Sequence, residues 1–248
     1  MADHTIVRTS IQDHSPSTDI PLDLHSPGLL AKWPIIGLFM FLFGGLIFGA
    51  LTVNLYAHGP LLQWDQMLAN TLPAIGLKSS AIVKYIMDAG FYLGKEVVIA
   101  LIIAHAIYFI AKRYWQELTM MLVGMFGSSS LFWIVIHVIN RQRPPDQIWI
   151  KVNLPSFPSG HAIAVVVFYG LLAYWIVPKI PSTFWKAFVI IFTVLLIGFI
   201  GFSRIFTGGH YLTDILAGYA VGIAWSGVVY TLIEKYFQKR RSRNVEKV

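Results

Sequence analysis

Six long apolar runs divide this chain, and they constrain its fold more strongly than any other feature. A helix needs about 20 consecutive, mostly apolar residues to cross the roughly 30 Å hydrocarbon core of a bilayer. The runs that approach this length are 33–56, 95–110, 118–139, 161–177, 185–202 and 212–236. Hydrophobic residues make up 56% of the 248 residues and charged residues only 12%, which excludes an ordinary soluble domain. The sequence therefore predicts an all-α integral membrane protein with six transmembrane helices.

The segments beside these runs differ in character. Segment 60–94 mixes leucine and isoleucine with scattered charges, a spacing that favours short interfacial amphipathic helices between spans one and two. Residues 1–32 are rich in Asp, Ser, Thr and Pro, and we expect them to form a flexible polar cytoplasmic tail. Residues 33–237 then form the six-helix domain, and residues 238–248 form a basic cytoplasmic tail.

Lysine and arginine are distributed unevenly over the connections between the runs. If the N-terminus is cytoplasmic, that side carries twelve of the 19 Lys and Arg residues, in keeping with the positive-inside rule. We therefore predict a multi-pass protein of the cell membrane with both termini in the cytoplasm. The formal net charge of +7 is dispersed over loops and the C-terminal tail, which favours contact with a membrane surface over binding to nucleic acid.

Three polar segments lie at the ends of the apolar runs, where a membrane chain seldom keeps charged groups without a use. The first reads Arg-Gln-Arg-Pro at 141–144, and the second reads Pro-Ser-Gly-His at 158–161. The third runs from Ser203 to Asp214 in the pattern S-R-x5-H-x3-D. The first two connect spans three and four, and the third connects spans five and six. The predicted topology thus brings all three to the same, non-cytoplasmic side.

His210 and Asp214 have the spacing of a histidine and its orienting carboxylate. Four positions separate them, so on a helix that starts near here they share one face. The carboxylate can then accept a hydrogen bond from one ring nitrogen, which leaves the other unprotonated as a nucleophile. The alternative is a histidine at a helix start whose carboxylate partner is purely structural.

His161 follows Ser159 and Gly160 at the start of another apolar run. Serine is a favoured N-cap, and the free N–H groups of a first helical turn bind anions. Beside a nucleophilic histidine, His161 is suited to act as a general acid, and Arg143 and Arg204 offer the positive charge that a phosphoryl transition state needs. The alternatives are a capped helix without chemistry and arginines that reach lipid headgroups.

Together these segments resemble the motifs of the type 2 phosphatidic acid phosphatase superfamily, in its membrane-bound lipid phosphatase branch. The family pattern is K-x6-R-P, then P-S-G-H, then S-R-x5-H-x3-D, and the chain reproduces the last two without change. The resemblance implies a phosphate-binding set made of Arg143, Ser159, Gly160 and Arg204. It also implies that His210 is the nucleophile, that His161 is the acid, and that Asp214 orients His210.

One position departs from the family pattern. Seven residues before Arg143 the family carries a lysine, and this chain has Ile136. The neighbouring His137 is a candidate substitute, although on a helix it is rotated by about 100° from position 136. Lys151 or Arg141 reaching in from the loop, or a site with one cation fewer, are the alternatives.

The resemblance implies metal-independent hydrolysis of a lipid phosphomonoester or diphosphate through a phosphohistidine. Candidate substrates are undecaprenyl diphosphate, phosphatidylglycerophosphate and phosphatidic acid. Neither a cofactor nor a metal is implied, and the absence of cysteine removes any thiolate metal site. Two alternatives stay open, a lipid-diphosphate phosphotransferase on the same fold and a non-catalytic protein that binds or transports lipid phosphates. The sequence leaves the oligomeric state open.

Overall fold

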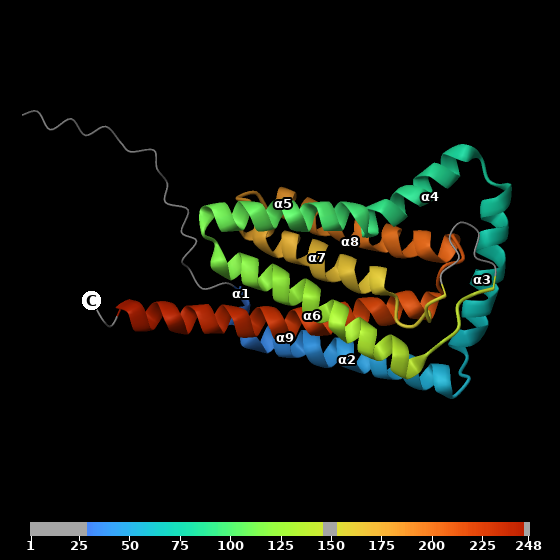
Figure 1. Ribbon diagram of the computed structural model, residues 1–248, viewed down its shortest axis with the longest axis horizontal. Coiled ribbons are helices and arrows are strands. Elements are labelled where there is room, and N and C mark those ends of the chain that lie inside the picture. Colours follow the sequence, from blue (N-terminus) through green and yellow to red (C-terminus); the bar gives the residue numbers. More distant parts are fainter. Residues whose placement is uncertain (1–28, 146–152, 246–248) are drawn as a thin grey trace, which may run out of the picture.

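The computed structural model describes residues 29–145 and 153–245, and every regular element within these ranges is a helix. The elements are α1 (Leu29–Lys32), α2 (Pro34–Tyr56), α3 (Leu61–Lys78), α4 (Ala81–Gly94), α5 (Glu96–Lys112), α6 (Trp115–Ile139), α7 (Gly160–Ile176), the 3₁₀ turn η1 (Val177–Lys179), α8 (Thr183–Phe206) and α9 (Leu212–Val245). Figure 1 shows the long helices side by side along the long axis of the molecule, with α7 in the middle.

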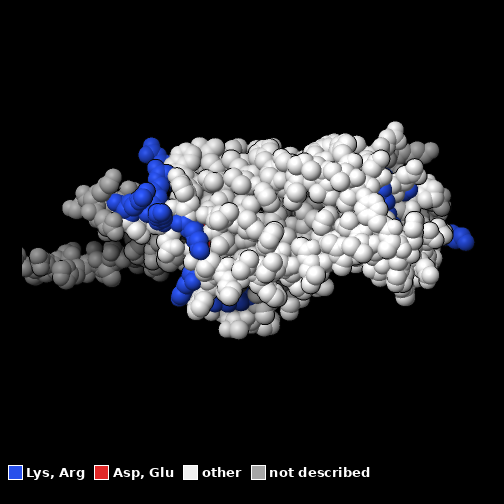
Figure 2. Space-filling view, turned by 90° about the horizontal axis from the view of Figure 1, so that it is seen from below, with Lys and Arg blue, Asp and Glu red and all other residues white. Residues whose placement is uncertain are grey.

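Six helical segments are long and apolar enough to cross a membrane, which confirms the predicted fold class. They are Pro34–Tyr56, Ala81–Lys112, Trp115–Ile139, Gly160–Lys179, Thr183–Phe206 and Leu212–Arg243. The second segment joins α4 to α5 at Lys95, so it begins earlier than the predicted run 95–110. Figure 2 shows Lys and Arg gathered at the two ends of the molecule, with an uncharged band between them on this face. Such a band suits contact with lipid.

The hydrophobic core lies around α7, whose sequence is apolar on all sides, as expected of a helix with neighbours all round it. Its fully buried side chains contact residues of α6, α8 and α9. Those on α7 are Ile163, Val165, Val167, Phe168 and Leu171. The second polar motif immediately precedes α7, so the central helix carries that motif into the middle of one end of the bundle.

Helix α3 lies across that end of the bundle rather than along it (Figure 1). Its buried residues are Asp65, Ala69, Pro73 and Gly76. They recur every three or four residues, so they form one stripe along the helix, and the other faces are largely exposed. This arrangement agrees with the predicted interfacial amphipathic helix, with one buried carboxylate in its stripe.

At the opposite end, α1 packs against α9 through a buried carboxylate. Glu234 of α9 accepts hydrogen bonds from the backbone N–H of Ala31 at 2.6 Å and from the hydroxyl of Tyr174 at 2.5 Å. The first of these bonds satisfies an N–H group that a helix start leaves free. Residues 29–32 of the expected tail therefore form a docked helix, and α9 extends through most of the expected tail 238–248. Residues 1–28 and 246–248 lie outside the described residues.

Glycine permits the close approach of α2 and α9. A Cβ atom at Gly44 would collide with the carbonyl oxygen of Ala220 and lie 2.9 Å from the backbone nitrogen of Ala224. A Cβ atom at the adjacent Gly45 would have no neighbouring atom within 4 Å. The pair therefore separates the effect of helix packing from the effect of helix propensity.

We predict that Gly44→Ala lowers the stability of the purified protein, whereas Gly45→Ala does not. Both changes add the same helix-favouring methyl group, but only at position 44 must two helices move apart, at a cost of about 1–3 kcal/mol. Thermal unfolding of the two variants in detergent, followed by circular dichroism, measures the difference. Equal melting temperatures for the two variants would contradict the described packing of α2 on α9.

Candidate active site

Hydrogen bonds between backbone groups join the three predicted motifs at one end of the bundle. The N–H of Ser156 donates to the carbonyl of Arg141 at 2.7 Å. The N–H of Ser159 donates to the carbonyl of Asp214 at 3.0 Å. The second bond joins residues 55 positions apart in sequence, and together the two bonds fix the motif segments against one another without relying on their side chains.

His210 is buried, and its two ring nitrogens have different surroundings. The Nδ1 atom lies 3.0 Å from the carbonyl oxygen of Ser156 and 3.5 Å from Oδ2 of Asp214. A carbonyl only accepts, so this contact assigns the proton to Nδ1 and leaves the lone pair on Nε2. We expected His210 at a helix start with Asp214 as its partner, but α9 begins two residues later, at Leu212. The shorter contact of Nδ1 is with Ser156.

The charge state of His210 follows from these surroundings. Burial lowers the pKa of the imidazole to about 4, although the hydrogen bond to Asp214 opposes the shift. The positive charge of Arg143 lowers the pKa further, since its Nη1 atom lies 3.2 Å from Nε2. At neutral pH the ring is therefore uncharged, and the lone pair on Nε2, which faces Nη1 of Arg143, is available as a nucleophile once a phosphate engages that guanidinium.

Arg143 is oriented by backbone carbonyls rather than by carboxylates. Its guanidinium donates to the carbonyl oxygens of Leu154 at 2.7 Å and of Gly209 at 2.6 Å. Burial lowers the pKa of the Arg143 guanidinium, and the charge of Asp214 only partly opposes this shift. Neutral acceptors hold the guanidinium in place but leave its charge available to an anion.

Arg204 lies near the C-terminal end of α8, and its exposed fraction is only 6%. Its Cζ atom stands 4.7 Å from the centre of the Phe91 ring, which is a cation–π contact. Among the described residues, no carboxylate forms an ion pair with Arg204, and its Nε atom is buried without a hydrogen-bond partner. A buried cation without a neutralising partner is well suited to bind an anion.

His161 occupies the first turn of α7, beside Arg204. Within the described ranges its Nε2 atom is buried without a partner, and its ring lies 5.4 Å from that of Phe91. Ser159 N-caps α7 as predicted, because its hydroxyl accepts from the N–H of Ala162 at 3.4 Å. The hydroxyl of Ser159 therefore serves the cap, whereas Gly160 lines the cavity described next.

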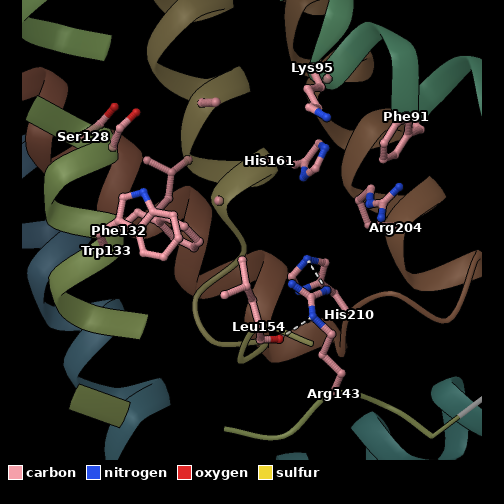
Figure 3. A pocket seen from close by; sticks show the side chains of 15 residues that line it. Phe91, Lys95, Ser128, Phe132, Trp133, Arg143, Leu154, His161, Arg204 and His210 are labelled. Carbon is pink, nitrogen blue, oxygen red and sulfur yellow. Dashed lines mark hydrogen bonds between the residues drawn. The ribbon is translucent and has the colours of Figure 1, made fainter. Parts of the chain in front are cut away.

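These groups line a cavity of about 570 Å³. Figure 3 shows His161 and His210 facing each other across it, with Arg204 beside them and Arg143 next to His210. The opposite wall is built from α6 and includes Ser128, Ser129, Phe132 and Trp133. One end of the cavity is therefore cationic and carries both histidines, and the other is largely apolar.

Asp214 is fully buried and is held by Arg141. Its Oδ1 accepts from Nη1 of Arg141 at 2.6 Å, and its Oδ2 accepts from the N–H of Tyr211 at 2.9 Å. Arg141 also stands over the Tyr211 ring, with its Cζ 4.0 Å from the ring centre. Arg141 therefore faces carboxylates, and it does not line the cavity as a substitute for the missing lysine.

Asp65 of α3 completes this network, and the sequence reading missed it. Its Oδ2 accepts from Nη2 of Arg141 at 2.7 Å, and its Oδ1 accepts from the N–H of Thr213 at 2.9 Å. Burial alone would lower the pKa of Arg141, but the charges of Asp214 and Asp65 raise it above the ordinary arginine value. The sequence did contain one sign of this role, since Asp65 is a charged residue in the otherwise apolar stripe of an amphipathic helix.

Of the other candidate substitutes for the missing lysine, His137 is described by the structure and does not line the cavity. His137 is exposed, its Nδ1 lies 2.7 Å from the carbonyl oxygen of Trp133, and its ring stacks on Trp133. Ile136 is fully buried and does not line the cavity. Lys151 lies outside the described residues. Lys95, which we did not single out from the sequence, is a lining residue.

Residues 93–238, more than half of the chain, match the family model of the PAP2 superfamily. The chain belongs to the PAP2 superfamily. A curated relative, Phosphatidylglycerophosphatase B of Bacillus subtilis (strain 168), is 30% identical over 141 residues. This match covers 56% of the present chain and 66% of the relative, just under two thirds of its length.

A solved structure shares the fold of this PAP2 protein. It is a transmembrane PAP2-type phosphatidylglycerolphosphate phosphatase from Bacillus subtilis, with a TM-score of 0.65 and 24% sequence identity. The similarity covers 82% of this chain and 96% of the other. The resemblance read from the three motifs is thus confirmed at the level of family and membrane fold.

Proposed function

We propose that this PAP2 protein is a membrane lipid phosphatase that transfers the phosphoryl group to His210 and then to water, without a metal ion. The observation that carries the proposal is the state of His210. Its Nδ1 is occupied by Ser156, and its unprotonated Nε2 lies in a cavity lined by two arginines and a second histidine. These are the parts that phosphoryl transfer through a histidine requires.

In the first step, Nε2 of His210 attacks phosphorus and the bond from phosphorus to the leaving oxygen breaks. The negative charge of the bound phosphate lets His161 hold a second proton, and His161 gives this proton to the leaving oxygen, which avoids the release of an alkoxide or a fully charged phosphate. Arg143 and Arg204 balance the charge that builds up on the equatorial oxygens. Asp214, 3.5 Å from Nδ1, stabilises the positive charge that the ring gains when Nε2 is phosphorylated.

In the second step, water attacks the phosphohistidine and the phosphorus–nitrogen bond breaks. His161, now neutral, accepts the proton of the attacking water and returns to its starting state. Inorganic phosphate leaves, and His210 regains its lone pair on Nε2. The cycle consumes one water and needs neither an oxidant nor a cofactor.

The shape of the cavity favours a lipid substrate. Its largely apolar wall belongs to the membrane-spanning helix α6, whereas its cationic end lies where the spans terminate. A phosphate headgroup can therefore sit among the arginines while its tails stay beside α6 in the bilayer. The candidates remain a prenyl diphosphate, phosphatidylglycerophosphate and phosphatidic acid, and the name of the curated relative supports the second.

We place the site on the non-cytoplasmic side of the membrane, with the chain termini in the cytoplasm. The C-terminal end of α9 lies at the end of the bundle opposite α3 (Figure 1). More of the Lys and Arg side chains visible in Figure 2 gather at this C-terminal end. The positive-inside rule assigns that end to the cytoplasm.

We expect His210→Ala to reduce phosphate release from lipid phosphates at least about 10³-fold, because no other group can take its role as nucleophile. His161→Ala should reduce it by about 10²–10⁴-fold, the usual contribution of a general acid. His105→Ala, on α5 and outside the cavity lining, is the matched control and should be fully active. Phosphate release from each candidate lipid, with and without a chelator, measures these effects.

Three results would contradict the proposal. Activity that survives in His210→Ala would show that His210 is not the nucleophile. Activity lost in chelator and restored by a divalent ion would identify a metal-dependent reaction. A phosphorylated acceptor formed with little free phosphate would identify the protein as a phosphotransferase.

We predict that Asp65→Asn lowers kcat about tenfold while KM changes less than twofold. Asp65 does not line the cavity, but it fixes Arg141, which in turn holds Asp214 beside His210. An asparagine turns its amide toward Arg141 or toward Thr213, so one of these two donors loses its acceptor. Asp88→Asn on α4 is the matched control, and steady-state kinetics per mole of folded protein measure the change. An unchanged kcat would show that Asp65 does not position the catalytic groups.

A further inference from the structure

Lys95 lies at the junction of α4 and α5, where the backbone leaves the helical conformation at φ −133° and ψ −72°. It lines the cavity together with His161, Arg204 and His210. In the chain it is 41 positions before Ile136, the position at which the family motif carries its lysine. The cavity therefore has a third cation, which comes from a different helix junction.

Close packing holds this junction against the active site. A Cβ atom at Gly94 would lie 2.9 Å from Ile200 and 3.3 Å from Cδ2 of His161. The hydroxyl of Tyr169 on α7 donates to the carbonyl of Leu93 at 2.8 Å. The backbone before Lys95 therefore leaves room for little more than a hydrogen atom beside the ring of His161, which ties the junction to the proposed general acid.

The cations have a fixed order along the cavity. In Figure 3, His161 lies between Lys95 and His210, and Arg143 is at the far end beside His210. Phe91 lies near both Arg204, at 4.7 Å, and Lys95, whose Nζ is 5.8 Å from the ring centre. Lys95 is therefore on the far side of the acid from the nucleophile, which is the side on which the leaving group departs.

The charge of Lys95 is available to a ligand. Its ion pair in the structure is with the adjacent Glu96, at 3.6 Å, and both side chains are about half exposed. An exposed pair of this kind contributes little and is screened by salt. An anion that reaches Lys95 therefore competes with a weak partner.

We propose that Lys95 binds a second anionic phosphate carried by the leaving group, so that the enzyme prefers lipids with two phosphates. The candidates differ in this respect. The leaving group of a lipid diphosphate is a lipid monophosphate. The leaving group of phosphatidylglycerophosphate keeps its phosphodiester, so both leaving groups are anionic. The leaving group of phosphatidic acid is a neutral diacylglycerol, which offers Lys95 no charge. This inference rests on the proposed function, since it takes His161 as the acid on the leaving-group side.

The test compares kcat/KM of Lys95→Met for three substrates, a prenyl diphosphate, phosphatidylglycerophosphate and phosphatidic acid. We expect a loss of at least tenfold for one or both of the two-phosphate lipids, and less than a twofold change for phosphatidic acid. Lys95→Arg should retain most of the preference, because the charge is kept. Lys78→Met, which removes an exposed lysine near the same end of the molecule, should change none of the three values.

Comparing the two lipids that carry two phosphates shows which position of the second phosphate Lys95 recognises. A loss confined to the prenyl diphosphate places the second phosphate next to the first, and a loss confined to phosphatidylglycerophosphate places it across the glycerol. Either result supports the proposal. Equal losses for all three substrates, or no loss for any, would overturn it.

A binding measurement keeps the inference testable apart from turnover. His210→Ala cannot form the phosphohistidine, so its affinity for inorganic pyrophosphate and for phosphate can be measured by calorimetry. Adding Lys95→Met should weaken pyrophosphate binding about tenfold and phosphate binding less than twofold. Equal changes for both anions would overturn the role of Lys95. If wild type releases no phosphate from any lipid, the proposed function fails, whatever the binding result.

Discussion

A single, largely buried arginine, Arg141, joins the parts of the active site. Its guanidinium bridges Asp65 of α3 and Asp214 of α9, at 2.7 Å and 2.6 Å, and is itself about 10% exposed. Removing one member of such a cluster leaves a buried charge without a partner, which is strongly destabilising. The network therefore couples the interfacial helix α3, the loop after α6 and the start of α9.

The arginines of the site divide into two kinds. Arg141 is neutralised by two carboxylates of the protein itself, so its charge is not available to a substrate and its role is to position Asp214. Arg143 is held by carbonyl oxygens and Arg204 by an aromatic ring, and both keep an uncompensated charge in the cavity. This division leaves two positive charges for a phosphate, while burial, helped by the charge of Arg143, holds the pKa of His210 low.

Local patterns in the sequence were enough to predict the membrane fold and the residues at the centre of the site. Hydrophobic run length is a property of each segment alone, and so is the spacing of His210 and Asp214. The motifs also predicted that His161 and Arg204 belong to the same site, and the structure brings both to one cavity. The predicted span 95–110 began too late because its charged first residue and the glycine before it resemble a boundary, whereas α4 and α5 together form one span.

Contacts between distant segments were beyond the reach of those patterns. Asp65 lies 76 positions before Arg141, and no spacing rule links an interfacial helix to a loop after the third span. Lys95 was hidden for the same reason, because contacts of the α4–α5 junction with α7, such as the bond from Tyr169 to Leu93, bring it to the cavity. His137 was favoured by its proximity in sequence to Ile136, but its side chain is exposed and does not line the cavity.

The central claim, that His210 carries the phosphoryl group, is tested most directly by trapping the intermediate. Wild-type protein mixed with a lipid phosphate labelled at its terminal phosphate is quenched within one turnover and digested under alkaline conditions, which preserve phosphohistidine. Peptide mass spectrometry should then locate the label on the imidazole of His210. A label on any other residue, or phosphate release at full rate without a phosphorylated protein, would contradict the account.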